Sequence, residues 1–129
     1  MKFKNVLGLA LTTLALNMVI LADANAAGVT VKCEVSSSRS KASVAGIHLS
    51  GRYVAKLSSG GKTVQSKPLA ADRLTHEVEF DFDSNPKDIA AGATAIPANF
   101  IKNAKVVGGV YVASTGALIG QVGASCKVK

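Results

Sequence analysis

The sequence has no tryptophan, and only two histidines, two cysteines and three prolines among its 129 residues. It also lacks motifs that reveal enzymes: no serine lies in a Gly-x-Ser-x-Gly turn, and no cysteine pair has the Cys-x-x-Cys spacing. Lysines are numerous, but they are scattered singly, and no aromatic residues alternate with them to stack bases. We therefore expect a protein that is not an enzyme, uses no cofactor and does not bind nucleic acid.

Residues 1–26 have the composition of a cleavable secretory signal. They comprise a lysine-containing start, an apolar stretch and a small-x-small cleavage site that ends at Ala26. The apolar stretch is about 17 residues long, near the lower limit for a membrane span, so an uncleaved N-terminal anchor is the alternative. No cysteine lies at the cleavage site to carry a lipid. We predict that residues 27–129 form one soluble domain that is periplasmic or secreted, with no stable membrane insertion.

The exported chain is basic. Removal of residues 1–26 takes away Lys2, Lys4 and Asp23 and leaves 13 Lys and Arg against 7 Asp and Glu, a net charge of +6. A solvated basic surface explains this excess most simply. The functional alternative is weak attraction to polyanions of the cell envelope, such as lipid phosphates or acidic polysaccharides, which salt would screen. The expected partner is a protein or another envelope component.

The two cysteines, Cys33 and Cys126, lie near opposite ends of the exported domain. Both belong to stretches in which apolar and polar residues alternate, so both side chains are expected to face the interior. A small domain outside the cytoplasm often needs a covalent link because its core is limited. We therefore predict a disulfide between them, since two sulfurs alone do not complete a zinc site.

Short alternating segments separated by Gly, Ser, Pro and Asp predict an antiparallel β-sandwich or barrel. Between the fifth and sixth segments, Asn85 caps a short helix that has Pro86 at its first position and ends before Gly92. The arrangement resembles the architecture of an immunoglobulin-like sandwich, although the usual buried tryptophan and cysteine pair are missing. The predicted fold is an all-β, immunoglobulin-like sandwich with one short helix and one disulfide. Its seven expected strands cover residues 29–35, 40–49, 52–58, 62–67, 76–83, 105–113 and 117–128.

Three of these segments carry detailed expectations about side-chain direction. The turn Gly60-Gly61 tolerates positive φ at both positions and sets Leu57 opposite Val64. In the second strand, the residues expected on one apolar face are Ala45, Ile47 and Leu49. In the fifth strand, Val78, Phe80 and Phe82 are expected to face the core, and the opposite, solvent-facing side carries Glu77, Glu79, Asp81 and Asp83.

The C-terminal hairpin, which turns at Thr115-Gly116, is partly apolar on both faces. Its expected buried face, with Tyr111 opposite Gly120, carries Val107, Tyr111, Ala113, Leu118, Val122 and Cys126. The opposite face carries Val106, Val110, Val112 and Ile119. Either a loop or the irregular segment 96–101 covers these four residues, or they form an exposed surface for a partner.

Two motifs are explained more simply by local structure than by chemistry. Residues 60–63, Gly-Gly-Lys-Thr, end like a phosphate-binding loop, but Lys56 stands where the first glycine belongs and a hairpin replaces the required helix. The second motif has the initial oxygen spacing of a calcium loop, but Pro86 and Gly92 replace the required glycine and glutamate. Its oxygen-bearing residues are Asp81, Asp83, Asn85 and Asp88.

The histidines, His48 and His76, are candidate ligands for copper or zinc together with Glu77 or Glu79. They lie 28 positions apart and have no cluster of close partners, so a structural or solvent-exposed role is the alternative. The sequence therefore predicts no metal site.

We conclude from the sequence that this is a non-enzymatic, exported binding or assembly module. The alternative from another class is an inhibitor of a secreted hydrolase, such as a lysozyme or protease, because small disulfide-closed domains present rigid loops. A pilin-type subunit is a further alternative, but nothing before Val29 has the pattern of a separate donor strand.

The signal sequence gives a direct test. We expect mass spectrometry of the natural protein to find a chain that starts at or near Ala27, because cleavage follows the small residue at position 26. Recovery of an intact chain from Met1 in the membrane fraction would instead establish an uncleaved anchor.

Overall fold

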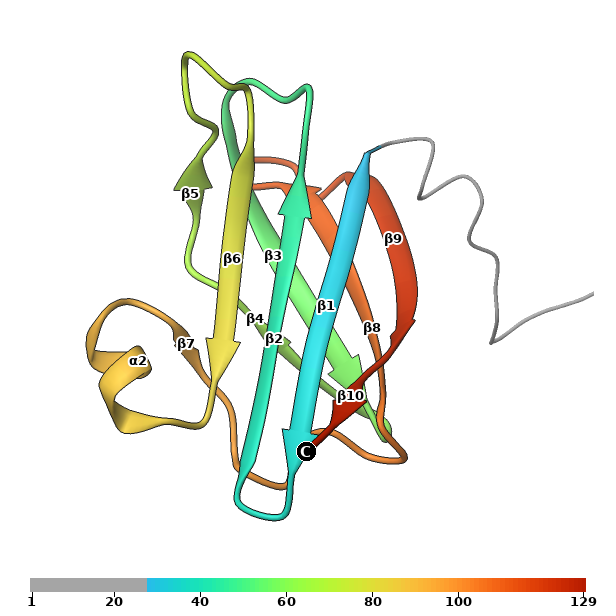
Figure 1. Ribbon diagram of the computed structural model, residues 1–129. Helices are drawn as coiled ribbons and strands as arrows, with labels where there is room; N and C mark the ends of the chain where they lie inside the picture. Colours follow the sequence, from blue (N-terminus) through green and yellow to red (C-terminus); the bar gives the residue numbers. More distant parts are fainter. Residues whose placement is uncertain (1–27) are drawn as a thin grey trace, which may run out of the picture.

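Two five-stranded sheets pack face to face in a β-sandwich (Figure 1). The structure is a computed structural model that describes residues 28–129, so the predicted signal and its cleavage site lie outside the described residues. In spatial order, the first sheet contains β10 (Lys127–Val128), β1 (Val29–Ser36), β2 (Arg39–Gly46), β6 (Val78–Asp83) and β7 (Thr94–Ala95). The second contains β4 (Lys62–Gln65), β3 (Arg52–Ser59), β8 (Lys105–Val112) and β9 (Leu118–Ser125), with β5 (Leu69–Ala70) paired to β3.

All seven predicted strands are present as β1, β2, β3, β4, β6, β8 and β9, and three two-residue strands are added to them. The short helix α2 (Pro86–Ala90) follows β6 as predicted, with Asn85 as its N-cap. The β-sandwich and its single disulfide are therefore confirmed. The immunoglobulin-like assignment remains a prediction, because β7 pairs in parallel with β6 and the disulfide does not join the two strands that it joins in antibody domains.

The turn between β3 and β4 has the predicted geometry. Gly60 and Gly61 adopt φ of 56° and 82°, and Leu57 pairs with Val64. Side chains other than glycine rarely accept two successive positive φ values, so the glycine pair determines this two-residue hairpin.

Alternation along β6 supplies the centre of the core. Val78, Phe80 and Phe82 are buried, as predicted. The irregular segment after β7 contributes further apolar side chains to the same cluster, namely Ile96, Phe100 and Ile101. The hydroxyl of Ser40 holds this segment in place, because it donates to the carbonyl of Ala98 (2.7 Å) and accepts from the N–H of Ile101 (3.2 Å).

The predicted face of the second strand was wrong. The inward side chains of β2 are those of Ala42 and Val44, whereas Ala45 is only half-buried and Ile47 is exposed. The strand ends at Gly46, and His48 takes a positive φ of 60°, which interrupts the alternation and turns Leu49 back into the core. The predicted face was therefore wrong because two of its three residues, Ile47 and Leu49, lie beyond the end of the strand.

The disulfide fixes the end of the chain. Cys33 and Cys126 are buried, with an S–S distance of 2.06 Å and a sequence separation of 93. Closure of so long a loop stabilises the fold by at most about 4–5 kcal/mol through loss of chain entropy in the unfolded state. The predicted final strand is interrupted at Cys126, after which β10 joins β1 in the other sheet through the pairs Glu34–Lys127 and Val35–Val128.

The two sheets approach each other closely at Gly108 of β8. A Cβ atom there would lie 2.7 Å from Cγ2 of Val31 and 2.8 Å from Cγ2 of Val44. Both valines belong to the opposite sheet. The absence of a side chain at this position allows the sheets to pack.

We therefore expect Gly108→Ala to lower the free energy of unfolding by about 1–3 kcal/mol, because the added methyl group forces both valines to move. Gly123→Ala is the matched control, since its Cβ would have no neighbour closer than 3.8 Å. It should be neutral or stabilising by up to ~1 kcal/mol. Urea unfolding of both variants measures the difference, and equal effects would contradict the packing argument.

Candidate binding surface

The residues predicted as a partner surface lie in the core. Val106 is 3% exposed and Val110 0%, while Val112 and Ile119 are half-buried and pack against the buried cluster. The exposed alternative for this face was therefore wrong. The residues are covered, but between the two sheets and not by a loop or by the segment 96–101 alone. These four side chains face the first sheet.

The error arose from the register of the hairpin. The predicted pairing placed Tyr111 opposite Gly120, but Val110 occupies that position and Tyr111 pairs with Leu118. A bulge between Val110 and Tyr111 takes up the extra residue, Ile119. A shift of one residue moves side chains to the other face, so the two faces were exchanged along β8 and at Leu118 and Ile119, whereas Val122 and Cys126 lie inward as predicted.

The face that points to solvent carries apolar side chains, three of which were expected to be buried, namely Val107, Tyr111 and Leu118. Leu118 is 54% exposed and Val107 39% exposed. Tyr111 lies between them and covers Gly109, where a Cβ would meet the ring at 3.0 Å. Its hydroxyl lies 3.4 Å from Oε1 of Gln121. We call Val107, Tyr111 and Leu118 the hairpin outer face.

Tyr111 is held in place from both sides. The ammonium group of Lys56, on the neighbouring strand β3, lies 4.6 Å from the centre of its ring, a favourable cation–π distance. Partial burial raises the pKa of the Tyr111 hydroxyl above its ordinary value, so the phenol stays neutral at physiological pH. The ring therefore presents a neutral, amphipathic surface.

Beside this face runs β9, which is the edge strand of the second sheet. It has eight residues, Leu-Ile-Gly-Gln-Val-Gly-Ala-Ser, and contains neither a charge nor a proline. In the described part of the chain, no strand pairs with its outer side, and Figure 1 shows it at the margin of the sheet. Its inward side chains Ile119, Val122 and Ala124 are only half-buried. The strand therefore presents free backbone groups next to incompletely covered apolar groups.

The other sheet edges in residues 28–129 are short or charged. β4 has four residues and carries Lys62, and β5, β7 and β10 have two residues each. The parts of β1 and β6 that β10 and β7 leave unpaired carry Lys32, Glu79 and Asp81. Short length and charge are the usual means of preventing strand addition. β9 has neither.

The outer face of the first sheet is charged, unlike β9. An open groove of about 550 Å³ crosses it, with Lys32 and Lys127 on one side, Ser43 between, and Glu79 and Asp81 on the other. These four charged groups form no ion pair within the described residues. A face of unpaired charges of both signs is typical of solvated protein surface, so it indicates binding less strongly than β9 does.

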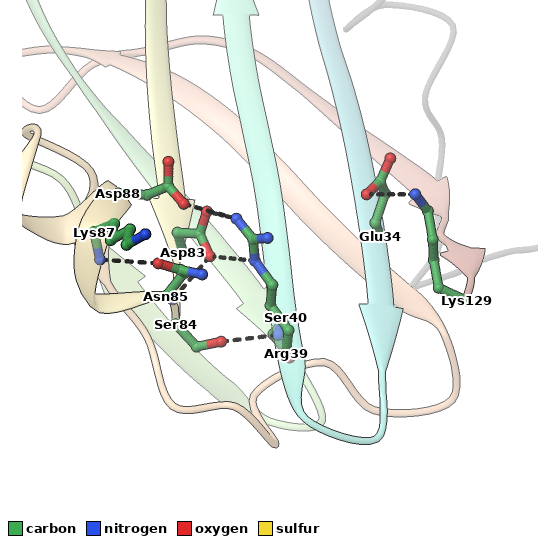
Figure 2. Close-up of polar contacts among 9 residues, drawn as sticks. All are labelled: Glu34, Arg39, Ser40, Asp83, Ser84, Asn85, Lys87, Asp88 and Lys129. Carbon is green, nitrogen blue, oxygen red and sulfur yellow. Dashed lines mark hydrogen bonds and ion pairs between the residues drawn. The ribbon is translucent and has the colours of Figure 1, made fainter.

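The calcium-loop residues form an ion-pair cluster instead. Asp83 is 2% exposed and receives two hydrogen bonds from the Arg39 guanidinium, at 3.0 and 2.7 Å, and Asp88 receives one at 2.8 Å (Figure 2). Asn85 accepts from the backbone N–H of Lys87 at 2.8 Å and so caps α2. The prediction that Asp83 faces solvent was therefore wrong. The alternation was correct, but Arg39 and the start of α2 cover the end of β6.

Burial alone raises the pKa of Asp83, but hydrogen bonds from Arg39 and from the backbone N–H groups of Asn85 and Ser84 outweigh it, so the pKa is lowered. A lowered pKa means that the carboxylate stabilises the fold above its unfolded pKa, near 3.9. This contribution is lost as the pH falls through the folded pKa. The cluster fixes α2 against β2, and its carboxylates are already occupied.

The remaining candidate groups do not assemble a site. His48 and His76 are exposed and adopt positive φ values of 60° and 59° on neighbouring loops, where the carbonyl of His76 accepts from the N–H of Leu49 at 2.9 Å. Between positions 28 and 129, no three side chains of His, Cys, Asp or Glu gather closely enough to hold a metal ion. The Gly60-Gly61 turn connects two antiparallel strands. It therefore lacks the strand–loop–helix context of a phosphate-binding loop.

No helix in the described part of the chain is both long and apolar enough to cross a membrane. Comparison of the chain with protein-family models, with curated proteins and with solved structures gave no match.

Two features of this surface were missed by sequence reasoning. The free edge of β9 had a signal, namely eight successive residues without charge or proline, but the alternating pattern did not show on which side a neighbour was missing. The pairing of Arg39 with Asp83 had no signal in the sequence, because 44 residues separate the two.

The Asp83 cluster leads to a pH-dependent prediction. Asp83→Asn should lower the free energy of unfolding by about 1–3 kcal/mol at pH 7, because the variant loses charge-assisted hydrogen bonds. The difference from the natural protein should begin to shrink below about pH 4, where the carboxylate of the unfolded chain becomes protonated, and should be lost as the pH falls through the lower pKa of the folded state. Asp81→Asn, on the same face of β6 but exposed, is the control and should change stability by no more than ~0.5 kcal/mol. A constant effect of Asp83→Asn from pH 7 to pH 3 would contradict this assignment.

Proposed function

We propose that this protein is a non-enzymatic, exported binding module that takes up an extended segment of a partner protein by strand addition to β9. The observation that carries the proposal is the combination of length, neutrality and an open outer side in this single strand. Main-chain hydrogen bonds supply much of the affinity when a peptide extends a sheet, and pockets for alternate side chains supply the specificity.

The neighbouring side chains support strand addition at this edge. A strand laid along β9 covers the half-buried Val122 and Ala124 on its inner side. On its outer side it meets Leu118 and the rigid ring of Tyr111. An added strand would therefore gain apolar contacts on both faces, in addition to the backbone hydrogen bonds.

The proposal separates two roles within the molecule. The disulfide, the core and the Arg39–Asp83 cluster hold the sheets in fixed positions. The hairpin outer face and β9 provide the recognition surface. A rigid edge keeps the entropic cost of binding low, because only the partner segment has to become ordered.

The proposal is tested by selection of peptides from a random display library on the natural exported protein. Bound peptides should slow amide hydrogen exchange in residues 118–125, because the added strand accepts hydrogen bonds from the outer side of β9. Protection confined to the loops around His48 and His76 would overturn strand addition. Protection of loops by a captured lysozyme or protease would favour the hydrolase-inhibitor alternative.

A pair of variants isolates the edge. Val122→Lys places an inward charge on the edge strand, and its long side chain must bend outward across the free backbone groups. We expect the affinity for the selected peptides to fall roughly tenfold or more, which corresponds to ~1.4 kcal/mol. Val64→Lys is the matched control, because Val64 is also a half-buried inward valine, on the opposite edge strand of the same sheet. Equal losses in the two variants would show that the effect is general destabilisation.

A further inference from the structure

Charge is strongly segregated along the described chain. Residues 72–88, which include β6 and most of α2, contain six of the seven Asp and Glu residues of the segment 28–129 and two of its 13 Lys and Arg. The rest of the segment therefore has 11 basic residues and one acidic residue. The acidic groups accordingly lie on and around β6, in the first sheet, across the groove that Ser125 and Lys127 also line.

The surroundings of β9 belong to the basic part. Lys105 pairs with Ser125 across the β8–β9 ladder and shares its face. Lys127 follows the strand by two residues, and Lys32 lines a groove together with Ser125 and Lys127. These three lysines form no ion pair within the described residues. Of the acidic residues that line this groove, Glu34 is already paired with Lys129 at 3.5 Å, and Glu79 and Asp81 lie across the groove on β6.

From this arrangement we infer that the segment that adds to β9 is acidic at the end that lies beside Ser125. The inference rests on the proposed function and specifies the chemistry of the partner. Lys105 lies beside Ser125 on β8, and Lys127 follows Ser125 on β10, so carboxylates at this end of an apolar extended segment would meet positive charge while its backbone pairs with the strand. Positive surroundings also raise the rate at which a negatively charged segment is captured.

The same charges argue against a second copy as the occupant. Antiparallel pairing of two β9 strands would place Lys105 and Lys127 of the two copies at opposite ends of the joint ladder, but each exported chain carries a net charge of +6. Like charges at an interface oppose association. Self-pairing should therefore be suppressed at low salt, where binding of an acidic segment is strongest.

The test compares synthetic peptides that share one apolar, alternating core taken from the library selection. One peptide has two glutamates at each end, one has glutamines and one has lysines. We expect binding to the natural protein to follow the order glutamate, glutamine, lysine, and the glutamate peptide alone should lose affinity as salt is raised from low to physiological concentration. Equal affinity for the glutamate and glutamine peptides would overturn the inference.

A double variant identifies the charges responsible. Lys105→Gln/Lys127→Gln should weaken binding of the glutamate peptide about threefold to tenfold, as expected for loss of two exposed charge contacts, and should leave the glutamine peptide unchanged. Lys62→Gln/Lys67→Gln is the matched control, because it removes the same charge at and after the opposite edge strand β4. An equal loss in both double variants would show that net charge, not position, governs binding and would overturn the inference.

Failure of the inference is distinguishable from failure of the proposed function. Protection of residues 118–125 by the glutamine peptide, without a glutamate preference, leaves strand addition intact and refutes only the acidic specificity. Sedimentation of the protein without peptide measures its oligomeric state. A dimer that forms through β9, as shown by its loss in Val122→Lys, would replace the acidic segment by a second copy.

Discussion

The crossing of the chain at Cys126 is the constraint on which the rest of the surface depends. The sulfur must reach Cys33 on β1, and the next two residues pair with β1 in the first sheet. The chain therefore leaves the second sheet at the end of β9, and β10 pairs with β1 in the first sheet instead of with the outer side of β9. A covalent link that stabilises a small domain thus also determines which edge remains open.

Most of the fold was predictable because its signals are local. The strand of Val78, Phe80 and Phe82 follows from alternation, the first hairpin from its glycine pair, and α2 from its cap and proline. The candidate surface was not predictable in this way, because the register between two strands is a nonlocal property. The sequence of the last hairpin is apolar on both faces, so neither face could be assigned until the bulge at Ile119 was known. The open edge likewise depends on which strand lies beyond β9, and no pattern within β9 contains that information.

The acidic residues of the segment 72–88 divide into two groups with different physical consequences. Asp83 is buried against Arg39, and Asp72 receives backbone hydrogen bonds from Leu74 and Thr75, which lower its pKa. Both stabilise local geometry. Glu79 and Asp81 make no ion pair in the described residues and remain exposed. Their position on β6 places this negative charge on the first sheet, across the groove from the end of β9, so the charge asymmetry of the molecule follows from the position of one acidic strand.

An open, uncharged edge is normally a liability, since two such strands can pair and aggregate. Here the protection lies outside the strand. Charged side chains within β9 would blunt the edge against every partner, whereas lysines beside it leave the backbone free and discourage only segments of like charge. Gly120 and Gly123 reinforce this division, because positions without a side chain let a partner backbone approach closely but contribute little apolar attraction of their own. In the proposed mode of binding, the flanking charge would provide selectivity and the strand would provide affinity.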